Sequence, residues 1–518
     1  MRNDGLGAWP ARRARMTPHR VAIVYEGRTI TYGELSVRVM RLANALRGLG
    51  VGRGDRVGYV GPNHPALAET LFASGLLGAI FVPLNTRLAV PELEDQLNDA
   101  EPQVLLWAPT FAATVAALRD RVRVRDYVAV DGGVDGAPDA TQGSLSYNEL
   151  LAGGAETQID EPVSLDDVCM VQYTSGTTGR AKGVLLSHGN VTWNCYNMLV
   201  DVDVIADEVS LVSAPMFHTA ALNQLFLPNF LKGGRAVLMS SFEPGRAFDL
   251  IAEHRVTWMF GVPTMFHAMS QSPRWAAADL SSVRILMCGG APVPEALIRA
   301  YGARGLLLLQ GYGMTESSPG ALFLRAADST DKIGSAGTPC FFTDVKVVRA
   351  DGDDVGVGEP GEVVMRGPNV TSGYWRLPAE TAAAFTDDWF HSGDVAVVDD
   401  EGYVTIVDRL KDMFISGGEN IYPVEVEKHL HENPAVADCA VIGVPDELWG
   451  EVGRAVVVLR PGASATPEAI LERLAGKVAN YKIPKSVVLV DAIPRTATGK
   501  LLRTQLRESY GQIQGDAR

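Results

Sequence analysis

The chain has 518 residues, of which 47% are hydrophobic and 21% are charged, and its formal net charge is −15. These fractions are typical of a globular protein. A chain of this length usually forms more than one domain, each with its own hydrophobic core. The acidic balance argues against broad binding to nucleic acids, because phosphate backbones require basic surfaces. The five cysteines are scattered and form no CxxC pair, which favours reduced, buried thiols in a cytoplasmic protein.

The N-terminal stretch MRNDGLGAWPARRARM carries arginines without the apolar segment of a secretory signal. Its pattern predicts the first helix of a domain, although a basic helix could also touch anionic lipid. The most apolar run, residues 71–84, is interrupted by glycines and a proline and is too short to cross a bilayer. We therefore expect no transmembrane segment, and peripheral contact with a membrane is left open.

Strand-like runs alternate with helical patterns up to about residue 407. The runs DRVGYVG, GAIFVPL, PQVLLWA, RAVLMS and VRILMCGG have the apolar character of buried strands, and segments such as YGELSVRVMRLANALRGLG have helical periodicity. Such alternation predicts an α/β architecture in which helices cover the sheets.

From about Asp344 the pattern changes to short alternating strands, including VAVVDDEGYVTIV, a predicted hairpin that turns on Asp-Glu-Gly. A compact α+β pattern follows residues 408–412, and its first helix is predicted to begin at Pro423. The predicted organisation is a large N-terminal α/β domain over residues 1–408, with a β-rich subdomain, and a small α+β domain over residues 409–518.

The glycine-rich stretch YTSGTTGRAKGV, residues 173–184, indicates a phosphate-binding loop that is not a P-loop. A Walker A loop ends in Gly-Lys-Ser/Thr, whereas Lys182 lies between Ala181 and Gly183. The apolar run before the loop and GVLLS after it predict two strands, whereas a P-loop leads into a helix. Glycines let the backbone approach a ligand, and hydroxyls, amides and the Lys182 ammonium suit phosphate oxygens.

Four further motifs complete the pattern. They are GGAP (residues 289–292), GYGMTE (311–316), HSGD (391–394) and PRTATGK (494–500). Together with the first loop, and in this order, they resemble the adenylate-forming (ANL) superfamily, which includes acyl-CoA synthetases, luciferases and the adenylation domains of peptide synthetases. The resemblance runs from TYGEL at Thr31 to the C-terminal tail, and Ala181 departs from it where the family usually has proline. It implies an acyl-CoA synthetase, an ATP-dependent acid–thiol ligase that forms AMP.

The resemblance implies ATP, Mg²⁺ and CoA as cofactors and assigns a role to individual residues. Those around the triphosphate are Thr174, Ser175, Gly176, Thr177, Thr178, Gly179 and Lys182. Those around the rest of the nucleotide are Gly289, Gly290, Ala291, Tyr312, Gly313, Thr315, Asp394 and Arg409. Thr174 and Glu316 would hold magnesium, a hard cation that takes few protein oxygens besides phosphate oxygens.

The chemistry implied by the resemblance has two steps. A carboxylate attacks the α-phosphorus of ATP and pyrophosphate leaves, and a thiol then attacks the acyl-adenylate. Lys500 would bridge the carboxylate and the α-phosphate, where its charge offsets the repulsion between two anions. The small domain would swing about the hinge residue Lys411 between the steps, removing Lys500 and bringing Gly417 and Gly418 to the tunnel for the pantetheine thiol.

The segment PMFHTAALNQLF, residues 215–226, is expected to line the acyl pocket. It holds no aspartate for an amine, which argues against amino acids, and His218 is predicted to orient the carboxylate. Gly313 stands where acetate-specific relatives carry tryptophan, so the acyl group is expected to be larger than acetate. A medium- or long-chain fatty acid ranks slightly ahead, because plant phenylpropanoid ligases carry a bulkier, polar residue at the position of Ala220.

Three alternatives remain open on the sequence alone. An aromatic acid of the feruloyl or cinnamoyl type also fits an uncharged pocket, and the N-terminal stretch resembles that of actinobacterial feruloyl-CoA synthetases. An acyl-AMP ligase that loads a carrier protein would share the motifs, although the insertion typical of such enzymes is not evident. A nucleotide sensor without turnover is disfavoured by the retained Lys182, Glu316, Asp394 and Lys500. The protein is expected to act on small molecules as a monomer or homodimer.

Overall fold

The computed structural model places most of the chain in two compact units. The large unit comprises Met1–Asp344 and Met365–Phe390, and the small unit comprises Val345–Val364 and His391–Arg518. The described residues are 3–130, 143–174, 181–291, 293–410, 412–416, 419–446, 449–475, 477, 478, 480–495 and 501–511, without the side chains of residues 409, 419 and 420. Both units mix helices and strands, which confirms the predicted fold class.

The large unit contains two sheets, and in the first most strand pairs are parallel. Its strand order is β7-β6-β5-β3-β4-β8-β9, with an antiparallel β8–β9 pair. The strands are β3 (Arg56–Val60), β4 (Ile80–Pro83), β5 (Val104–Trp107), β6 (Asp126–Ala129), β7 (Leu145–Ser146), β8 (Val168–Thr174) and β9 (Lys182–Ser187). Strands β3, β4 and β5 coincide with the first three apolar runs predicted from the sequence.

The second sheet of the large unit has the order β16-β15-β14-β13-β12-β10-β11-β1-β2. The strands are β1 (Val21–Tyr25), β2 (Arg28–Thr31), β10 (Val209–Val212), β11 (Arg235–Leu238), β12 (Trp258–Gly261), β13 (Ile285–Cys288), β14 (Leu308–Gly313), β15 (Gly320–Phe323) and β16 (Thr338–Pro339). The pairs from β14 across to β11 are parallel, so these strands end along one edge. In open parallel sheets, ligands bind outside this carboxyl edge.

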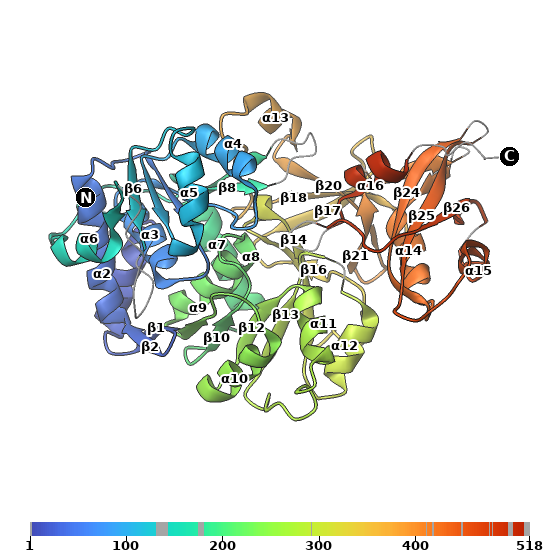
Figure 1. The fold of residues 1–518 in the computed structure, drawn as a ribbon, viewed down its shortest axis with the longest axis horizontal. Coiled ribbons are helices and arrows are strands. Elements are labelled where there is room, and N and C mark those ends of the chain that lie inside the picture. Colours follow the sequence, from blue (N-terminus) through green and yellow to red (C-terminus); the bar gives the residue numbers. More distant parts are fainter. Residues whose placement is uncertain are drawn as a thin grey trace. The chain divides into compact units, whose positions relative to one another are not determined.

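Helices flank both sheets of the large unit. They are α1 (Trp9–Met16), α2 (Tyr32–Gly48), α3 (Pro65–Leu76), α4 (Val90–Ala100), α5 (Ala112–Leu118), α6 (Tyr147–Gly153), α7 (His188–Asp201), α8 (Thr219–Ala221), α9 (Leu227–Lys232), α10 (Pro244–His254), α11 (Pro263–Gln271), α12 (Glu295–Gly302) and α13 (Pro378–Ala383). A capping box between Thr31 and Glu34 starts α2, the helix that the sequence pattern predicts. Figure 1 shows α10, α11 and α12 beside the strands β10 to β13.

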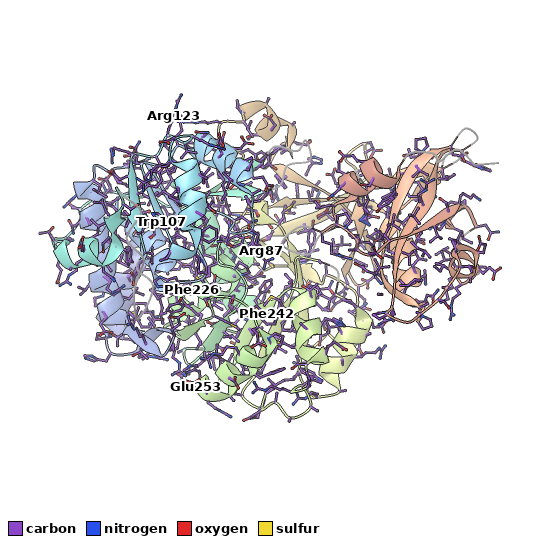
Figure 2. The ribbon with its side chains drawn as sticks, in the orientation of Figure 1. Arg87, Trp107, Arg123, Phe226, Phe242 and Glu253 are labelled. Atoms are coloured by element: carbon purple, nitrogen blue, oxygen red, sulfur yellow. The ribbon has the colours of Figure 1, made fainter. Side chains whose placement is uncertain are left out.

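The interior of the large unit is apolar and closely packed. Trp107 on β5 and Phe226 just before α9 are 3% and 1% exposed, whereas the side chains of Arg123 and Glu253 are 84% and 56% exposed. Figure 2 shows Trp107 and Phe226 surrounded by other side chains, and Arg123 and Glu253 at the edge of the unit. Burying one large apolar side chain contributes about 1.5–3 kcal/mol, so many such residues make the sheets a firm support for the strand ends.

The basic N-terminal helix takes part in this packing. Helix α1 buries Trp9, and the Arg13 guanidinium donates two hydrogen bonds to the Leu231 carbonyl oxygen, at 3.2 and 2.9 Å. Arg12 donates to the Asn3 carbonyl oxygen at 2.8 Å. Because these arginines are used within the fold, the contacts favour a first helix of the domain over a helix that binds lipid.

The small unit also contains two sheets. The first is formed by β17 (Asp344–Val348), β18 (Gly361–Arg366), β20 (Trp389–Val398) and β21 (Val404–Arg409). Trp389 and Phe390, the first residues of β20, belong to the large unit, where they pair with β19 (Phe385–Thr386). The second has the order β23-β22-β25-β24, with β26 beside β25. The remaining elements are β22 (Phe414–Ser416), β23 (Glu419–Ile421), β24 (Val436–Asp446), β25 (Gly450–Leu459), β26 (Ser486–Leu489), α14 (Pro423–His431), α15 (Pro467–Glu472) and α16 (Arg503–Tyr510). The predicted β20–β21 hairpin and the helix that begins at Pro423 are both present.

The two units divide the chain differently from the domain boundary expected at residues 408–412. The small unit contains the expected domain 409–518. It also contains residues 345–364 and 391–408, which make up most of the β-rich subdomain. Compactness reports packing and does not locate a hinge, so a hinge at 408–412 stays a prediction. Lys411 itself lies outside the described residues.

Two predictions from composition can be compared with the fold. No helix within the described ranges combines the length and the apolarity that crossing a bilayer requires. All five cysteines are free and buried, as predicted for small apolar side chains. The cytoplasmic location and the oligomeric state stay predictions.

Candidate active site

Strands β8 and β9 place two predicted phosphate-binding residues opposite each other. The strands pair in antiparallel register, with Thr174 opposite Lys182 at the loop end of the ladder. The Thr174 hydroxyl donates to the Lys182 carbonyl oxygen at 3.5 Å. This confirms the predicted strand–loop–strand arrangement and distinguishes the loop from a P-loop, which would lead into a helix. Residues 175–179 lie outside the described residues, so their contact with phosphates stays a prediction.

The predicted adenine-binding motifs meet at the carboxyl edge of the second sheet. Strands β13 and β14 are parallel neighbours with Cys288 beside Gln310, so residues 289–291 after β13 and GYG at the end of β14 reach the same edge. A Cβ atom at Gly289 would lie only 3.0 Å from the Gly311 carbonyl oxygen, and Gly290 has a φ of +82°. Close backbone approach and a left-handed conformation therefore explain these two glycines. The other predicted residues at this edge are partly exposed: Ala291, Tyr312 and Thr315.

Gly313 ends β14, and Met314 separates it from the 3₁₀ helix η4 (Thr315–Ser317). A Cβ atom at this position would lie 1.6 Å from the Pro319 carbonyl oxygen. In this structure the backbone around residue 313 therefore leaves no room for a Cβ atom, and a side chain here would require the loop that carries Pro319 to shift. The sequence analysis interpreted this glycine as leaving the acyl pocket open. It could not predict the contact with Pro319, because that contact arises from the fold of the loop after β14.

Glu316 is buried among backbone segments of the large unit. The residue is 7% exposed, and its Oε1 atom accepts a hydrogen bond from the Tyr374 hydroxyl at 3.1 Å. Its carbonyl oxygen accepts from the Thr371 amide at 2.7 Å, and the Thr371 hydroxyl donates to the Leu185 carbonyl oxygen at 2.5 Å. Thr371 therefore ties η4, which carries Glu316, to β9, which begins with Lys182.

Tyr374 is a residue of this site that the sequence analysis did not single out. Its hydroxyl reaches Glu316, and the Lys182 ammonium nitrogen lies 5.0 Å from the centroid of its ring. Burial, followed by the neighbouring Glu316 carboxylate, raises the pKa of Tyr374 well above its usual value. The hydroxyl is therefore protonated at neutral pH and donates to the carboxylate. A Tyr-Trp pair ahead of a helix is too common in sequences to have indicated this position.

The residues predicted to hold magnesium have suitable chemistry. The Thr174 hydroxyl and the Glu316 carboxylate are oxygen donors, which Mg²⁺ prefers, and substrate phosphates supply most of its other ligands. The hydrogen bond from Tyr374 orients the carboxylate, as outer partners of metal ligands do. The donor set therefore fits Mg²⁺, and its assignment to these two residues stays a prediction.

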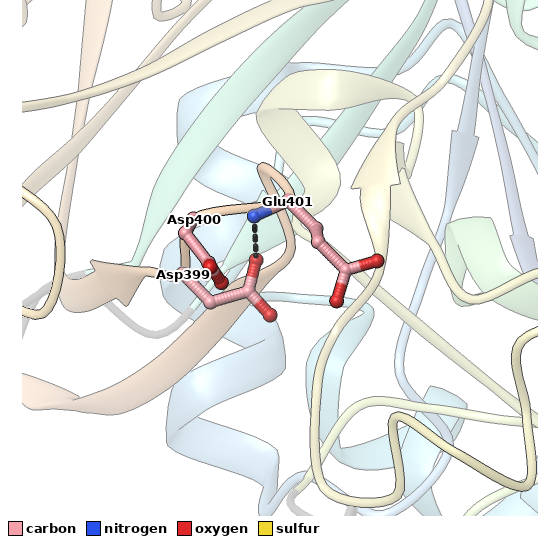
Figure 3. A group of neighbouring side chains, drawn as sticks. All are labelled: Asp399, Asp400 and Glu401. Atoms are coloured by element: carbon pink, nitrogen blue, oxygen red, sulfur yellow. Dashed lines mark hydrogen bonds between the residues drawn. The ribbon is translucent and has the colours of Figure 1, made fainter.

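A group of acidic side chains lies at the turn between β20 and β21 of the small unit. Figure 3 shows these neighbouring side chains, Asp399, Asp400 and Glu401. The Asp399 carboxylate accepts hydrogen bonds from the backbone amides of Glu401 at 3.0 Å and of Tyr403 at 2.8 Å. Aspartate commonly caps turn amides in this way. The hairpin turn therefore explains the group, and we assign no metal to it.

The HSGD motif and Arg409 lie on adjacent strands of the small unit. Asp394 on β20 is the direct cross-strand partner of Arg409 on β21, and Asp394 is 7% exposed. This register brings together the two residues predicted to contact the ribose. Glu362 on β18 holds the motif, since its carboxylate accepts from the Gly393 amide at 2.9 Å and lies 2.8 Å from Nδ1 of His391. The sequence analysis did not predict this role for Glu362.

The remaining predicted residues of the small unit lie outside the described residues. They are the lysine of the first step, the hinge residue and the two glycines of the CoA tunnel, namely Lys500, Lys411, Gly417 and Gly418. Residues 496–500 all lie outside the described residues, and Arg495 and Leu501 stand on either side of them. Arg495 and Leu501 form an antiparallel bridge, and the Arg495 guanidinium bonds the Asp438 carboxylate at 2.7 Å. The base of the lysine-bearing segment is thus attached to β24.

The segment expected to line the acyl pocket forms a distorted helix. Helix α8 continues into a π-helical turn, Leu222–Phe226, a distortion that is frequent at functional sites. His218 directly precedes α8 and is partly exposed, and its role in orienting the carboxylate stays a prediction. Gln224 in the π-turn is 7% exposed, and its side-chain nitrogen lies 3.8 Å from the place of a Cβ atom at Gly311. The segment therefore reaches β14, which carries part of the predicted nucleotide site.

This combination of a strand-to-strand glycine-rich loop, a carboxylate on η4 and an HSGD hairpin defines an adenylate-forming enzyme. The model of the AMP-binding enzyme family matches residues 10–375, and that of the AMP-binding enzyme C-terminal domain matches residues 425–500. The crystal structure of ATP-bound MatB from Rhodopseudomonas palustris has a TM-score of 0.90 to this chain at 32% identity, covering 99% of this chain and 100% of that one. The chain therefore belongs to the AMP-binding enzyme family, as the motifs predict.

Known relatives match along nearly the whole chain. A feruloyl-CoA synthase from Amycolatopsis sp is 53% identical over 99% of this chain and 100% of its own. An indoleacetate–CoA ligase from Aromatoleum aromaticum is 42% identical over 97% of this chain and 98% of its own. A long-chain-fatty-acid–CoA ligase from Mycobacterium tuberculosis is 38% identical over 98% of this chain and 99% of its own. The acyl-CoA synthetase branch is thus confirmed: the protein is an AMP-forming carboxylate–CoA ligase that uses ATP, Mg²⁺ and CoA.

Proposed function

We propose that the protein is an aromatic acid–CoA ligase and that its substrate is a ring-oxygenated cinnamic acid such as ferulate. The observation that carries this proposal is the 53% identity, over the full length, to a feruloyl-CoA synthase. A further relative is named for another aromatic acid, and the fatty-acid ligase is less similar, at 38% identity. These comparisons favour the aromatic alternative over the fatty acid, which the sequence analysis ranked first on the single position of Ala220.

Buried amide groups near the expected acyl pocket support an acid with oxygen substituents. Gln224 reaches the strand of the GYG motif beside Gly311. Among the described residues, both side-chain polar atoms of Asn223 and the Oε1 atom of Gln310 are buried without a hydrogen-bond partner. Leaving a buried polar group unsatisfied costs about 1–3 kcal/mol. A phenol hydroxyl can donate to an amide oxygen, and a phenol or methoxy oxygen can accept from an amide nitrogen, whereas the chain of a fatty acid offers no hydrogen bond.

In the proposed first step, the substrate carboxylate attacks the α-phosphorus of ATP, the bond to pyrophosphate breaks, and an acyl-adenylate forms. Lys182 at the start of β9 neutralises the leaving phosphates, and Lys500 neutralises the carboxylate and the α-phosphate. His218 orients the carboxylate. Magnesium, when bound, offsets charge on the phosphates that leave. Asp394 accepts hydrogen bonds from the ribose hydroxyls, which requires a group that only accepts.

In the proposed second step, the CoA thiol attacks the acyl carbonyl, the bond to AMP breaks, and the thioester forms. A swing of the small domain about Lys411 would withdraw Lys500 between the steps. Gly417 and Gly418 would let the pantetheine arm pass close to the backbone, because they carry no side chain.

Pyrophosphate release across a panel of acids tests the proposed substrate. The panel contains ferulate, p-coumarate, cinnamate, benzoate, octanoate and palmitate, each measured with and without CoA. We expect ferulate or p-coumarate to have the highest kcat/KM, about tenfold or more above unsubstituted cinnamate, because unpaired polar groups discriminate against a ligand that lacks the partner. A thioester and AMP should appear when CoA is added. The highest kcat/KM for palmitate would restore the fatty acid and refute the aromatic assignment.

A further inference from the structure

Tyr374 lies on a short segment, residues 373–375, that runs beside β9 in the large unit. Val184 and Tyr374 form an antiparallel bridge, and the Trp375 amide donates to the Gly183 carbonyl oxygen at 2.7 Å. These contacts set the register of the segment against the strand that begins with Lys182. The position of the Tyr374 side chain is therefore set by strand pairing as well as by its own contacts.

The Tyr374 side chain contacts two groups of opposite charge that are predicted to face the ATP phosphates. Its hydroxyl donates to Oε1 of Glu316 at 3.1 Å. The Lys182 ammonium lies 5.0 Å from the ring centroid, within the range of a cation–π contact. Both charged residues stand on firmly held backbone, Lys182 in the β8–β9 ladder and Glu316 on η4, which Thr371 joins to β9.

We propose that Tyr374 is a positioning residue for the phosphate and metal end of the ATP site, holding the Glu316 carboxylate with its hydroxyl and the Lys182 ammonium with its ring. The inference rests on the proposed roles of Lys182 and Glu316. A carboxylate and an ammonium in one site attract each other, and a rigid aromatic side chain that contacts both keeps each aimed at its own part of the ligand. Losing an outer hydrogen bond to a metal ligand typically costs 10- to 100-fold in metal affinity or activity, about the scale expected here.

Two substitutions separate the two contacts. Tyr374→Phe removes the hydroxyl and keeps the ring, whereas Tyr374→Leu removes both. Calorimetry of ATP binding, without acid or CoA and over a series of Mg²⁺ concentrations, reads out binding rather than turnover. We expect Tyr374→Phe to raise the Mg²⁺ concentration for half-maximal enhancement of ATP binding about tenfold and to leave Mg²⁺-free affinity unchanged. Tyr374→Leu should also weaken Mg²⁺-free binding about two- to fivefold, through loss of the cation–π contact.

Tyr127 provides a matched control in the same unit. The Arg119 guanidinium lies 4.3 Å from its ring centroid, so it too is a tyrosine beside a cation. It lies on β6, four places from β8 in the strand order, and its hydroxyl has no hydrogen-bond partner in the described part of the chain. Tyr127→Phe should therefore change neither the Mg²⁺ dependence of ATP binding nor the unfolding temperature.

The outcomes distinguish this inference from the proposed function. If the wild-type protein does not bind ATP, the proposed function fails. If it binds ATP and Tyr374→Phe shows the wild-type Mg²⁺ dependence, the positioning role of Tyr374 is refuted. A Mg²⁺ effect that comes only with a lowered unfolding temperature would indicate a structural role and also refute it. In a Glu316→Ala background, which has no side-chain acceptor for the Tyr374 hydroxyl, Tyr374→Phe should add no further effect on the Mg²⁺ dependence, because both changes remove the same hydrogen bond, and an additive effect would overturn the proposal.

Discussion

Charged residues of the two units are held in place by different means. In the large unit, Lys182 and Glu316 lie on backbone segments that strand pairing and Thr371 join together. In the small unit, the segment that carries Lys500 leads into α16, whose first residue, Arg503, bonds both carboxylate oxygens of Glu427 at 2.6 and 2.8 Å. The side chains of this ion pair are only 7% and 8% exposed. Lys182 and Glu316 are thus held mainly by backbone geometry, whereas the start of α16 is held by a buried pair of charges.

This difference indicates where each unit is vulnerable. Backbone that is closely packed has no room for an added atom, so the large unit should be sensitive to small-to-large changes near its motifs. A buried ion pair is sensitive to loss of one partner, because the other charge is left buried and uncompensated. Glu427 also accepts a hydrogen bond from the Val441 amide at 2.7 Å, and it thereby links α14, β24 and α16.

The largest effect is expected from Glu427→Gln in the small unit. The substitution leaves the Arg503 charge buried without its partner, and we expect a loss of about 3–5 kcal/mol in the free energy of unfolding of this unit. Urea unfolding measures it. Glu432→Gln is the control, since Glu432 pairs with Lys477 on the surface, with side chains 45% and 41% exposed, and such pairs contribute about 1 kcal/mol or less. Equal losses in both variants would contradict the comparison.

The next largest effect is expected from Lys500→Ala. Removing the ammonium should lower the rate of acyl-adenylate formation about 100- to 1,000-fold, by analogy with deleting one preorganised donor to a developing charge. ATP binding should persist, because Lys182, the predicted phosphate ligand, and Glu316, the predicted magnesium ligand, belong to the large unit. Pyrophosphate release and calorimetry measure the two quantities. Undiminished pyrophosphate release would remove the basis for assigning Lys500 to the first step.

The smallest of the three effects is expected from Gly313→Ala in the large unit. Its added methyl group would meet the Pro319 carbonyl oxygen, and we expect a loss of about 1–3 kcal/mol in the free energy of unfolding. Gly311→Ala is the matched control on the same strand, because its nearest neighbour would lie at 3.5 Å, an ordinary contact. Thermal and urea unfolding compare the two variants. A Gly313→Ala protein as stable as Gly311→Ala would show that this backbone yields more readily than we argue.

Several parts of the fold and site could be predicted from short stretches of sequence. The apolar runs around the first loop predicted β8 and β9, and the spacing of Lys182 excluded a P-loop. Tyr374 and Glu362 could not be found in this way, because their partners are distant in the chain. Glu316 lies 58 residues before Tyr374, and His391 lies 29 residues after Glu362. A tyrosine or a glutamate carries no local pattern that reports such a contact.

The sequence by itself determined the α/β class, the order of the motifs and the adenylate-forming chemistry that they imply. The α/β class follows from hydrophobic periodicity, and the chemistry follows from the resemblance of five short motifs to the adenylate-forming superfamily; both signals are local in the sequence. Only the tertiary structure decided that a Cβ atom at residue 313 would meet the Pro319 carbonyl oxygen, which strands bring Asp394 beside Arg409, and how one tyrosine joins Glu316 to Lys182. Each of these depends on packing between segments that meet only when the chain is folded, and steric contact and hydrogen bonding act through space rather than along the sequence.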